Sequence, residues 1–313
     1  MTLTISNKNF LITGGTGQVG SFLIEELLEN NANVTVIGRS IKNLKEIKNY
    51  VDSKKINFIE CDLTDEHRIK EINDSLKNID FLIHLSSQFR FSEPNALSSA
   101  YHTIELDIKS TIFLIQQLKR LKGILFTSSV AVYGKPLQTP VNELFQIKPI
   151  TYYGCGKFAV EKYLKLHCND NNIPLTILRI STIYGQRDRS EQMIPVFIKK
   201  ALQNEPITLY GNSSRDFIHI SDVIKTIMNA IKLNQNKLFN IGTGKGFSNN
   251  FIVKKIINIS KSKSKITYLD KSDNYDFICD NSKSIKELNF TPIISIEKGL
   301  EDEISWYKNE IKK

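Results

Sequence analysis

The sequence predicts an α/β fold: a doubly wound parallel sheet with helices on both faces, followed by a smaller C-terminal lobe. Short β-rich runs alternate with helical stretches, and a glycine-rich turn joins the first run to the first helical stretch. Alternation of this kind is typical of parallel sheets whose crossover helices cover both faces. The expected strands are residues 9–13, 34–37, 56–60, 81–85, 124–128 and 175–179.

Apolar residues between the expected strands recur at helical spacing, which indicates the core-facing sides of helices. One such set is Phe22, Leu23 and Leu27, and another is Val160, Tyr163, Leu164 and His167.

The regular alternation ends near Gly185. Pro195, Pro206 and many Asn and Ser residues interrupt the next stretch, and helical patterns return at about 223–231 and 251–259. We therefore expect a first domain over 1–180, which also receives segment 216–245, and a second lobe over 181–313.

The charge of the chain favours a small anionic ligand over nucleic acid. Lys and Arg number 42 against 33 Asp and Glu, a net charge of +9. The lysines are scattered, however, and no interleaving of aromatic and basic residues accompanies them, as single-stranded nucleic-acid sites require. We expect no nucleic-acid partner.

The cysteines and the N-terminus favour a cytoplasmic protein. Cys61, Cys155, Cys168 and Cys279 form no close pair and no metal-like spacing with histidines, so we expect neither disulfides nor a metal site. The first apolar run, 10–13, is far shorter than a signal sequence or a membrane span. We therefore expect no membrane association.

The glycine turn predicts a dinucleotide site of the Rossmann type. Gly14, Gly17 and Gly20 follow a strand and open a helix, where they allow a tight turn, a close approach to a pyrophosphate and close helix packing. The helix N-terminus then faces the phosphate charge. A plain strand-to-helix turn is the alternative. The other turn residues expected at the cofactor are Thr16, Gln18 and Val19.

The end of the second strand favours NADP(H), with NAD(H) left open. An acid that would bind a ribose 2′-hydroxyl is missing, and Arg39 and Ser40 stand there instead as donors for a 2′-phosphate. A solvated surface arginine is the alternative. Asp62 and Leu63 are expected near the adenine, although Asp62 is also a candidate helix N-cap. After the fourth strand, Leu85 and Ser86 complete the expected cofactor contacts.

Three residues are candidates for acid–base chemistry. Tyr153 and Lys157 lie four residues apart, on one face of a predicted helix, where the ammonium is expected to lower the pKa of the phenol from its ordinary value of about 10. Ser129 ends an expected strand at the carboxyl edge of the sheet and can donate to the same substrate oxygen. His84 and His219 are interpreted as structural.

With these motifs the chain resembles the extended short-chain dehydrogenase/reductase family, in its nucleotide-sugar epimerase/dehydratase branch. The resemblance extends through Leu178-Arg179, Tyr184-Gly185, Arg215-Asp216-Phe217-Ile218 and Asn240-Ile241-Gly242-Thr243-Gly244. It implies an NAD(P)-binding domain over 1–180 and a mainly nucleotide-sugar-binding lobe over 181–313. Ser129, Tyr153 and Lys157 are then catalytic, Tyr153 and Lys157 also contact the cofactor, and Ser129 also contacts the substrate.

The resemblance also implies substrate contacts and a homodimer. Arg215 is the expected diphosphate ligand, and Thr182 lies beside the nucleotide-sugar. A second diphosphate arginine is not found before Asp280, so Arg187, Arg189 or Lys271 is a candidate replacement, with surface charge as the alternative. The long fourth helix and the Tyr-Lys helix are expected to pair with those of a second copy.

Several residues depart from the family pattern. Val130 and Ala131 stand where dehydratases carry an Asp-Glu pair, which argues against dehydration. Asp107 and Thr182 stand where relatives often carry Asn, and Gly156 replaces a common serine.

Three functions remain open. In the first, NADPH-dependent reduction, hydride is delivered to the C4 ketone of a nucleotide-linked 4-keto-(6-deoxy)sugar and Tyr153 protonates the resulting oxygen. The second is 4-epimerisation with a tightly bound cofactor, which uses the same three residues. The third, disfavoured by the intact Ser129, Tyr153 and Lys157, is a non-catalytic NADP-binding regulator.

Overall fold

The computed structural model describes residues 3–40, 46–87, 96–188, 191–269 and 275–311. The chain divides into two compact units. Unit 1 comprises Met1–Gly134, Ile147–Arg179 and Ile224–Phe239, and unit 2 comprises Lys135–Gln146, Ile180–Val223 and Asn240–Lys313. The chain passes from one unit to the other after residues 134, 146, 179, 223 and 239.

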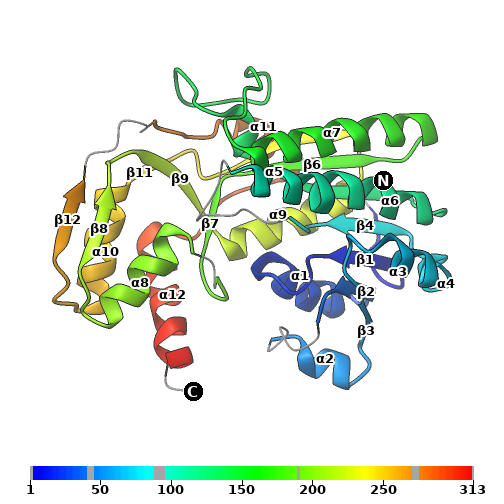
Figure 1. Ribbon diagram of the computed structural model, residues 1–313, viewed down its shortest axis with the longest axis horizontal. Coiled ribbons are helices and arrows are strands. Elements are labelled where there is room, and N and C mark those ends of the chain that lie inside the picture. Colours follow the sequence, from blue (N-terminus) through cyan, green and yellow to red (C-terminus); the bar gives the residue numbers. More distant parts are fainter. Residues whose placement is uncertain (1–2, 41–45, 88–95, 189–190, 270–274, 312–313) are drawn as a thin grey trace. The chain divides into compact units, whose positions relative to one another are not determined.

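A seven-stranded sheet forms the framework of unit 1, in the order β10-β6-β5-β4-β1-β2-β3 (Figure 1). The neighbours of β1 and of β4 are parallel to them. The strands are β1 (Asn9–Thr13), β2 (Asn33–Gly38), β3 (Ile56–Glu60), β4 (Phe81–His84), β5 (Gly123–Ser129), β6 (Leu175–Ile180) and β10 (Lys237–Ile241). Every strand predicted from the sequence is confirmed, with ends that agree to within one residue.

The strand order reverses beside β1, which makes the sheet doubly wound. From β1 the chain first builds outward through β2 and β3, and then crosses to β4, on the other side of β1. The crevice at the carboxyl ends of two strands that part in this way is where open α/β sheets bind ligands.

Helices cover both faces of this sheet. Leu11 of β1 packs in a core with residues of α6 (Ser110–Gln117) and α7 (Tyr152–Asn171). Its neighbours Phe10 and Ile12 point to the opposite face, because side chains alternate along a strand, and they are fully buried as well. The remaining helices with residues in unit 1 are α1 (Gln18–Glu29), α2 (Lys48–Asp52), α3 (Glu66–Glu71), α4 (Asn73–Leu76), α5 (Leu97–Thr103), the π-helix η2 (Ile104–Lys109), the 3-10 helix η3 (Val130–Tyr133) and α9 (Ile220–Leu233).

Helix α7 carries two of the predicted site residues, and its N-terminus is defined by a side-chain cap. The Thr151 hydroxyl accepts a hydrogen bond from Gly154 N at 3.1 Å. Val160 and Leu164 are buried as expected, whereas Tyr163 is 47% exposed. The prediction of a core position for Tyr163 is therefore wrong. The buried face of α7 includes Val160 and Leu164, which are four residues apart, but not Tyr163.

A buried ion pair ties α7 to β6. Arg179 Nε and Nη2 donate to the two carboxylate oxygens of Glu161 at 2.9 and 2.7 Å, and Arg179 Nη1 donates to Tyr133 Oη at 2.9 Å. The Ser128 hydroxyl donates to Glu161 at 2.5 Å. Because every partner is satisfied, the two charges compensate for each other's loss of hydration.

Unit 2 is built from small sheets and three packed helices. Strand β9 (Ser214–His219) pairs antiparallel with β11 (Gly246–Ser248) and parallel with β7 (Thr182–Tyr184), while β8 (Ile207–Tyr210) pairs with β12 (Ile266–Leu269). Residues of α8 (Met193–Leu202), α10 (Asn249–Ser260) and α12 (Ile296–Ile311) share one apolar core. A shorter helix, α11 (Ser282–Leu288), completes the unit.

The structure shows more order after Gly185 than the sequence indicates. Pro195 lies in the first turn of α8, where its missing N–H removes no helical hydrogen bond. Reading that proline as an interruption was therefore wrong. The helical pattern at 251–259 is confirmed by α10, and that at 223–231 by α9.

Replacing Glu161 with Ala is expected to lower the free energy of unfolding by about 3–5 kcal/mol, because Arg179 is left buried without its counter-charge. The control is Asp302→Ala, which breaks an exposed pair with Lys298 and is expected to cost less than about 1 kcal/mol. Urea unfolding measures both. Equal losses in the two variants would contradict the assigned role of the buried pair.

Candidate active site

The glycine turn has the conformation that a pyrophosphate site requires. Gly14 has φ +70°, and a Cβ there would lie 2.9 Å from Ser86 N. A Cβ on Gly20 would lie 2.4 Å from Gly14 O, so α1 begins directly against the turn. Gly17 is the N-cap residue, and no described side chain caps this helix end. The positive end of α1 is thus offered to an anion.

These features fit a dinucleotide, because the turn is free of side-chain bulk where a phosphate must approach the backbone. Of the other predicted contacts in the turn, Thr16, Gln18 and Val19 are partly exposed. Leu85 N and Ser86 N both donate to Thr13 Oγ1 at 3.2 Å, which holds the segment after β4 beside the end of β1.

The residues expected at the adenosine end of the cofactor follow β2 and β3. Arg39 directly follows β2 and is exposed, and Ser40 is half-buried. Asp62 accepts hydrogen bonds from Thr64 N and Thr64 Oγ1 at 2.9 Å and so closes a turn. The N-cap of α3 is Asp65, so the alternative N-cap role for Asp62 is wrong. The Leu63 side chain is buried in the core.

The structure brings Ser129, Tyr153 and Lys157 together within unit 1. Lys157 Nζ donates to Thr127 O at 2.8 Å and lies 5.8 Å from the centre of the Tyr153 ring. It also lies 4.8 Å from the centre of the Phe126 ring. A hydrogen bond between Ser129 and Tyr153 acts to lower the pKa of the phenol.

The protonation of Tyr153 differs from the sequence-based expectation. Burial, followed by the charge of Asp107, raises the pKa of Tyr153 to about 12. The expected lowering of this pKa is therefore wrong, because desolvation of the hydroxyl has the largest effect on it and the Ser129 hydrogen bond opposes that effect only in part. Burial also lowers the pKa of Lys157 to about 8, against the opposing effects of Asp107 and Glu161.

Asp107 is the residue near this site whose placement the sequence did not indicate. It lies in η2, is 3% exposed, and faces α7. A Cβ on Gly156 would lie 2.1 Å from Thr103 Cγ2 and 3.2 Å from Asp107 Oδ2. This close approach explains the glycine where relatives carry a serine. In the sequence, the one sign of a role for Asp107 was that relatives often carry Asn at this position. Only the fold shows which groups its side chain faces.

The structural interpretation of His84 is confirmed, and that of His219 only in part. His84 is fully buried, its Nδ1 and Nε2 are each 2.8 Å from a threonine hydroxyl, and burial lowers its pKa to about 3. The ring is therefore neutral. His219 Nδ1 accepts from Ser221 N at 3.3 Å, while its Nε2 is buried without a partner among the described residues.

The predicted substrate residues other than Ser129 lie in unit 2. Arg215 of β9 donates through Nη1 to Ser214 O at 3.1 Å and also to Tyr275 O, and its guanidinium lies 4.3 Å over the Tyr275 ring. Thr182 begins β7, and Arg187 has φ +65°, and both are partly exposed. The other two candidates for the second diphosphate ligand, Arg189 and Lys271, lie outside the described residues.

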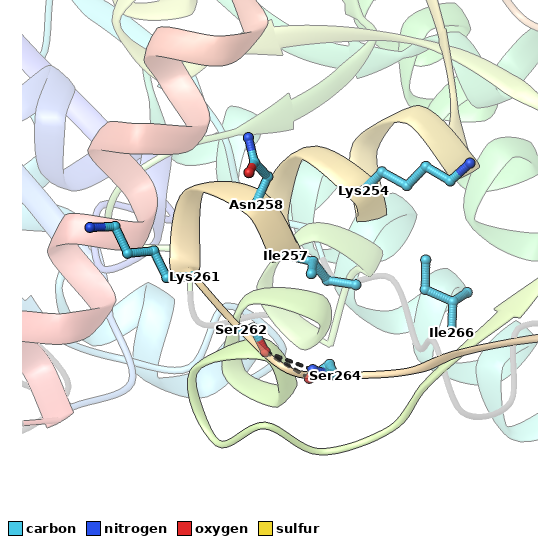
Figure 2. Close-up of a pocket in the computed structure, with 7 residues that line it drawn as sticks. All are labelled: Lys254, Ile257, Asn258, Lys261, Ser262, Ser264 and Ile266. Carbon is cyan, nitrogen blue, oxygen red and sulfur yellow. Dashed lines mark hydrogen bonds between the residues drawn. The ribbon is translucent and has the colours of Figure 1, made fainter.

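A surface pocket of about 630 Å³ in unit 2 contains none of the predicted site residues (Figure 2). Lys254, Ile257, Asn258 and Lys261 of the α10 end line it, together with Ser262, Ser264 and Ile266. The hydroxyls of Ser262 and Ser264 bond to each other at 2.9 Å. Because the serines satisfy each other and no acid–base pair is present in its lining, the pocket is not a candidate active site.

Over the described ranges, no three or more His, Cys, Asp or Glu side chains are grouped so as to hold a metal ion. Within the same part of the chain, no helix has both the length and the apolar character needed to cross a membrane.

Comparison with known proteins agrees with this geometry. Residues 10–242 match the model of the NAD dependent epimerase/dehydratase family. The chain belongs to this family. It is 31% identical to a provisionally assigned UDP-glucose 4-epimerase of Methanocaldococcus jannaschii, over 96% of this chain and 98% of that protein. It is 28% identical to the dTDP-4-dehydro-6-deoxyglucose reductase of Escherichia coli, over 93% and 95%.

Solved structures of the NAD dependent epimerase/dehydratase family share the fold. The UDP-glucuronic acid 4-epimerase of Bacillus cereus, in complex with UDP-glucuronic acid and NAD, superimposes with a TM-score of 0.86 at 26% identity. The match covers 96% of this chain and 99% of that one. The chain is thus an enzyme of the extended short-chain dehydrogenase/reductase type, as the resemblance implied, with a Rossmann-type domain.

Proposed function

We propose that this enzyme uses NADPH to reduce the C4 ketone of a nucleotide-diphosphate-linked 4-keto-(6-deoxy)sugar. The observation that carries the proposal is the grouping of the Tyr153 phenol with Ser129, its hydrogen-bond partner, and with Lys157 Nζ, 5.8 Å from the centre of the phenol ring. Reduction of a ketone requires a proton donor at the carbonyl oxygen, and a phenol whose pKa is about 12 is in its donor form at neutral pH.

The cofactor is held by the glycine turn and the ends of the neighbouring strands. Gly14, Gly17 and Gly20, with the N-terminus of α1, take the pyrophosphate. Arg39 and Ser40 take a 2′-phosphate, and Tyr153 and Lys157 contact the nicotinamide ribose. The remaining contacts are those of Thr16, Gln18, Val19, Asp62, Leu63, Leu85 and Ser86. When bound, the reduced nicotinamide supplies the hydride.

The proton is supplied by the chain's own residues. Ser129 and Tyr153 donate hydrogen bonds to the ketone oxygen, which gains negative charge as the carbonyl carbon is reduced. The O–H bond of Tyr153 then breaks and its proton passes to that oxygen, which completes the alcohol. Lys157, whose pKa is about 8, stabilises the phenolate and can return a proton to it.

The proposed nucleotide-diphosphate ligands are Arg215 above all, with Thr182 and Arg187. The similar proteins support this substrate class, because their names specify UDP- and dTDP-linked sugars. Dehydration is disfavoured because Val130 and Ala131, in η3 directly after Ser129, carry no acid–base groups.

The second candidate function is 4-epimerisation, supported by the epimerases of M. jannaschii and B. cereus. Epimerisation begins with oxidation of a sugar alcohol, so Tyr153 must first accept a proton. Its raised pKa opposes that first step, whereas it suits reduction.

We further propose a homodimer, supported by exposed apolar side chains on packed helices of unit 1. Leu97, Tyr101 and Ile104 follow four- and three-residue spacing along α5 and η2, and Tyr163 and Leu166 share a face of α7. Their exposed fractions range from 47% to 70%. Apolar surface of this kind is typical of protein interfaces, and a second copy is the proposed occupant.

The reaction is tested with purified enzyme, NADPH and dTDP-, UDP-, GDP- and CDP-linked 4-keto-6-deoxysugars. We expect one NADPH consumed for each ketone reduced, and a roughly 10²- to 10⁴-fold lower kcat in Tyr153→Phe, because the general acid is lost. Tyr152→Phe, one residue away, is the control. Interconversion of C4 epimers by enzyme that retains cofactor through purification, with no added NADPH, would replace reduction with epimerisation.

Replacing Arg39 with Ala is expected to weaken NADPH binding roughly 10- to 100-fold and to leave NADH binding nearly unchanged, because only NADPH carries the 2′-phosphate. Calorimetric titration of both cofactors measures this. Lys119→Ala, which removes an exposed cation elsewhere in unit 1, is the control. A wild-type enzyme that binds NADH more tightly than NADPH would contradict the cofactor proposal.

Light scattering tests the dimer. We expect twice the chain mass of 35.8 kDa for the wild type, and the chain mass for Tyr101→Glu combined with Leu166→Glu, because charges in a buried apolar interface are costly. Leu137→Glu, which alters a fully exposed leucine in unit 2, is expected to leave the dimer intact. A monomeric wild type would refute the proposal.

A further inference from the structure

We propose that Asp107 is a positioning residue for proton transfer, whose carboxylate keeps the proton on the Tyr153 phenol and so favours reduction over oxidation. The proposal rests on the proposed function, because it takes Tyr153 as the proton donor and Lys157 as its partner.

The position of the carboxylate is the first argument. Asp107 lies in the π-helical segment η2, and its carboxylate is close to the first turns of α7, as the 3.2 Å from Oδ2 to a Cβ on Gly156 shows. Gly156 directly precedes Lys157 and lies one turn from Tyr153. The carboxylate therefore lies near both groups, and its charge acts on each of them.

The burial of the carboxylate is the second argument. Asp107 is 3% exposed, and among the described residues the Ser87 hydroxyl is the group that hydrogen-bonds to it. In that part of the chain it forms no ion pair within 4 Å, although Lys157 acts on it through space. Leaving a carboxylate in this state is costly, and Asn would fill the same space without the charge. A charge held at such a cost, beside acid–base groups, indicates a functional role.

The surrounding charges leave Asp107 as the counter-charge to Lys157. On α7, Glu161 is already paired with Arg179, and in β4 His84 is neutral. On the adjoining helices, His102 of α5 is partly buried, and Lys109 is exposed and paired with Glu66 and Glu105. Burial raises the pKa of Asp107, against the lowering effects of the Lys157 charge and of the hydrogen bond from Ser87, which follows β4.

The effect on proton transfer follows from the sign of the charge. A nearby carboxylate disfavours the phenolate and so raises the pKa of Tyr153. It also favours the ammonium and so opposes the lowering of the pKa of Lys157 by burial. Both groups therefore keep their protons to higher pH. That is the state from which a ketone oxygen is protonated, and it is the wrong state for removing a proton from an alcohol.

The test is the ionisation of Tyr153, followed by phenolate absorbance as the difference between wild type and Tyr153→Phe. In the wild type we expect ionisation above the ordinary value of about 10. In Asp107→Asn, compared with Asp107→Asn/Tyr153→Phe, we expect the midpoint to fall by about one pH unit or more. Lys157, with a pKa of about 8, is neutral across this range, so the change reports on Asp107 alone.

The second readout is the pH dependence of kcat/KM for ketone reduction. We expect its fall on the alkaline side to begin at lower pH in Asp107→Asn, because Lys157 and Tyr153 both lose protons more readily. Asp80→Asn is the matched control, since Asp80 is also buried in unit 1 but pairs with Lys122, and its pH profile is expected to match the wild type. Asp107→Ser provides a second neutral variant.

The outcomes separate the two proposals. Unchanged Tyr153 ionisation in folded Asp107→Asn or Asp107→Ser overturns the role of Asp107, even if reduction is confirmed. A wild-type phenol that ionises at or below its ordinary value overturns it without any variant. A shifted phenol in an enzyme that reduces no keto-sugar supports the charge effect and contradicts the proposed function.

Discussion

The active part of unit 1 depends on burying one ammonium, that of Lys157. The group is 3% exposed, and what compensates for its lost hydration is distributed over three elements. The Thr127 carbonyl at the end of β5 accepts its hydrogen bond, the Phe126 ring lies beneath it, and the carboxylates of Asp107 and Glu161 oppose the fall in its pKa. Because these partners come from β5, η2 and α7, the position of the ammonium fixes how the three elements pack. Burial also brings the pKa of Lys157 close to neutrality, where an amine can both give and take a proton.

The reversal of strand order beside β1 is the second feature on which the site in unit 1 depends. It places the end of β4 next to the glycine turn, so Thr13 Oγ1 can hold the backbone of Leu85 and Ser86 while Gly14 leaves room for them. A side chain on Gly14 would collide with that segment. The same reversal leaves the carboxyl ends of β4 and β5 beside one another, so Ser129 and the Lys157 contact at Thr127 lie on the edge where the cofactor site begins. The proposed cofactor-binding and catalytic residues of unit 1 thus share one edge of one sheet.

The sequence predicted the parts of this arrangement that depend on local pattern. The strands of the sheet, the turn at Gly14 and the pairing of Tyr153 with Lys157 follow from alternation, glycine spacing and helical periodicity. What it could not predict depends on contacts between distant segments. Spacing alone gives the distance along a helix from Tyr153 to Lys157 but not the depth of burial, which reverses the expected change in the pKa of Tyr153. Asp107 is 46 residues before Tyr153, and only the packing of η2 on α7 brings it to the site. In unit 2, Pro195 suggested an interruption because its place in a first turn depends on where α8 begins.

Reduction and epimerisation use the same three residues, so the difference between them must lie in the charge around Tyr153. An epimerase needs a phenolate to begin its cycle, and a lone ammonium beside the phenol would favour that form. Here the carboxylate of Asp107 opposes the ammonium, and Glu161 adds no net charge because Arg179 neutralises it. The phenol is left beside a nearly balanced pair, in a site that burial keeps poor in water, so it behaves as an acid. The proposed 2′-phosphate site at Arg39 would act in the same direction by an independent route, since NADPH is the cofactor that cells keep reduced. In our proposal, two charges in unit 1, one at the phenol and one after β2, favour reduction over epimerisation.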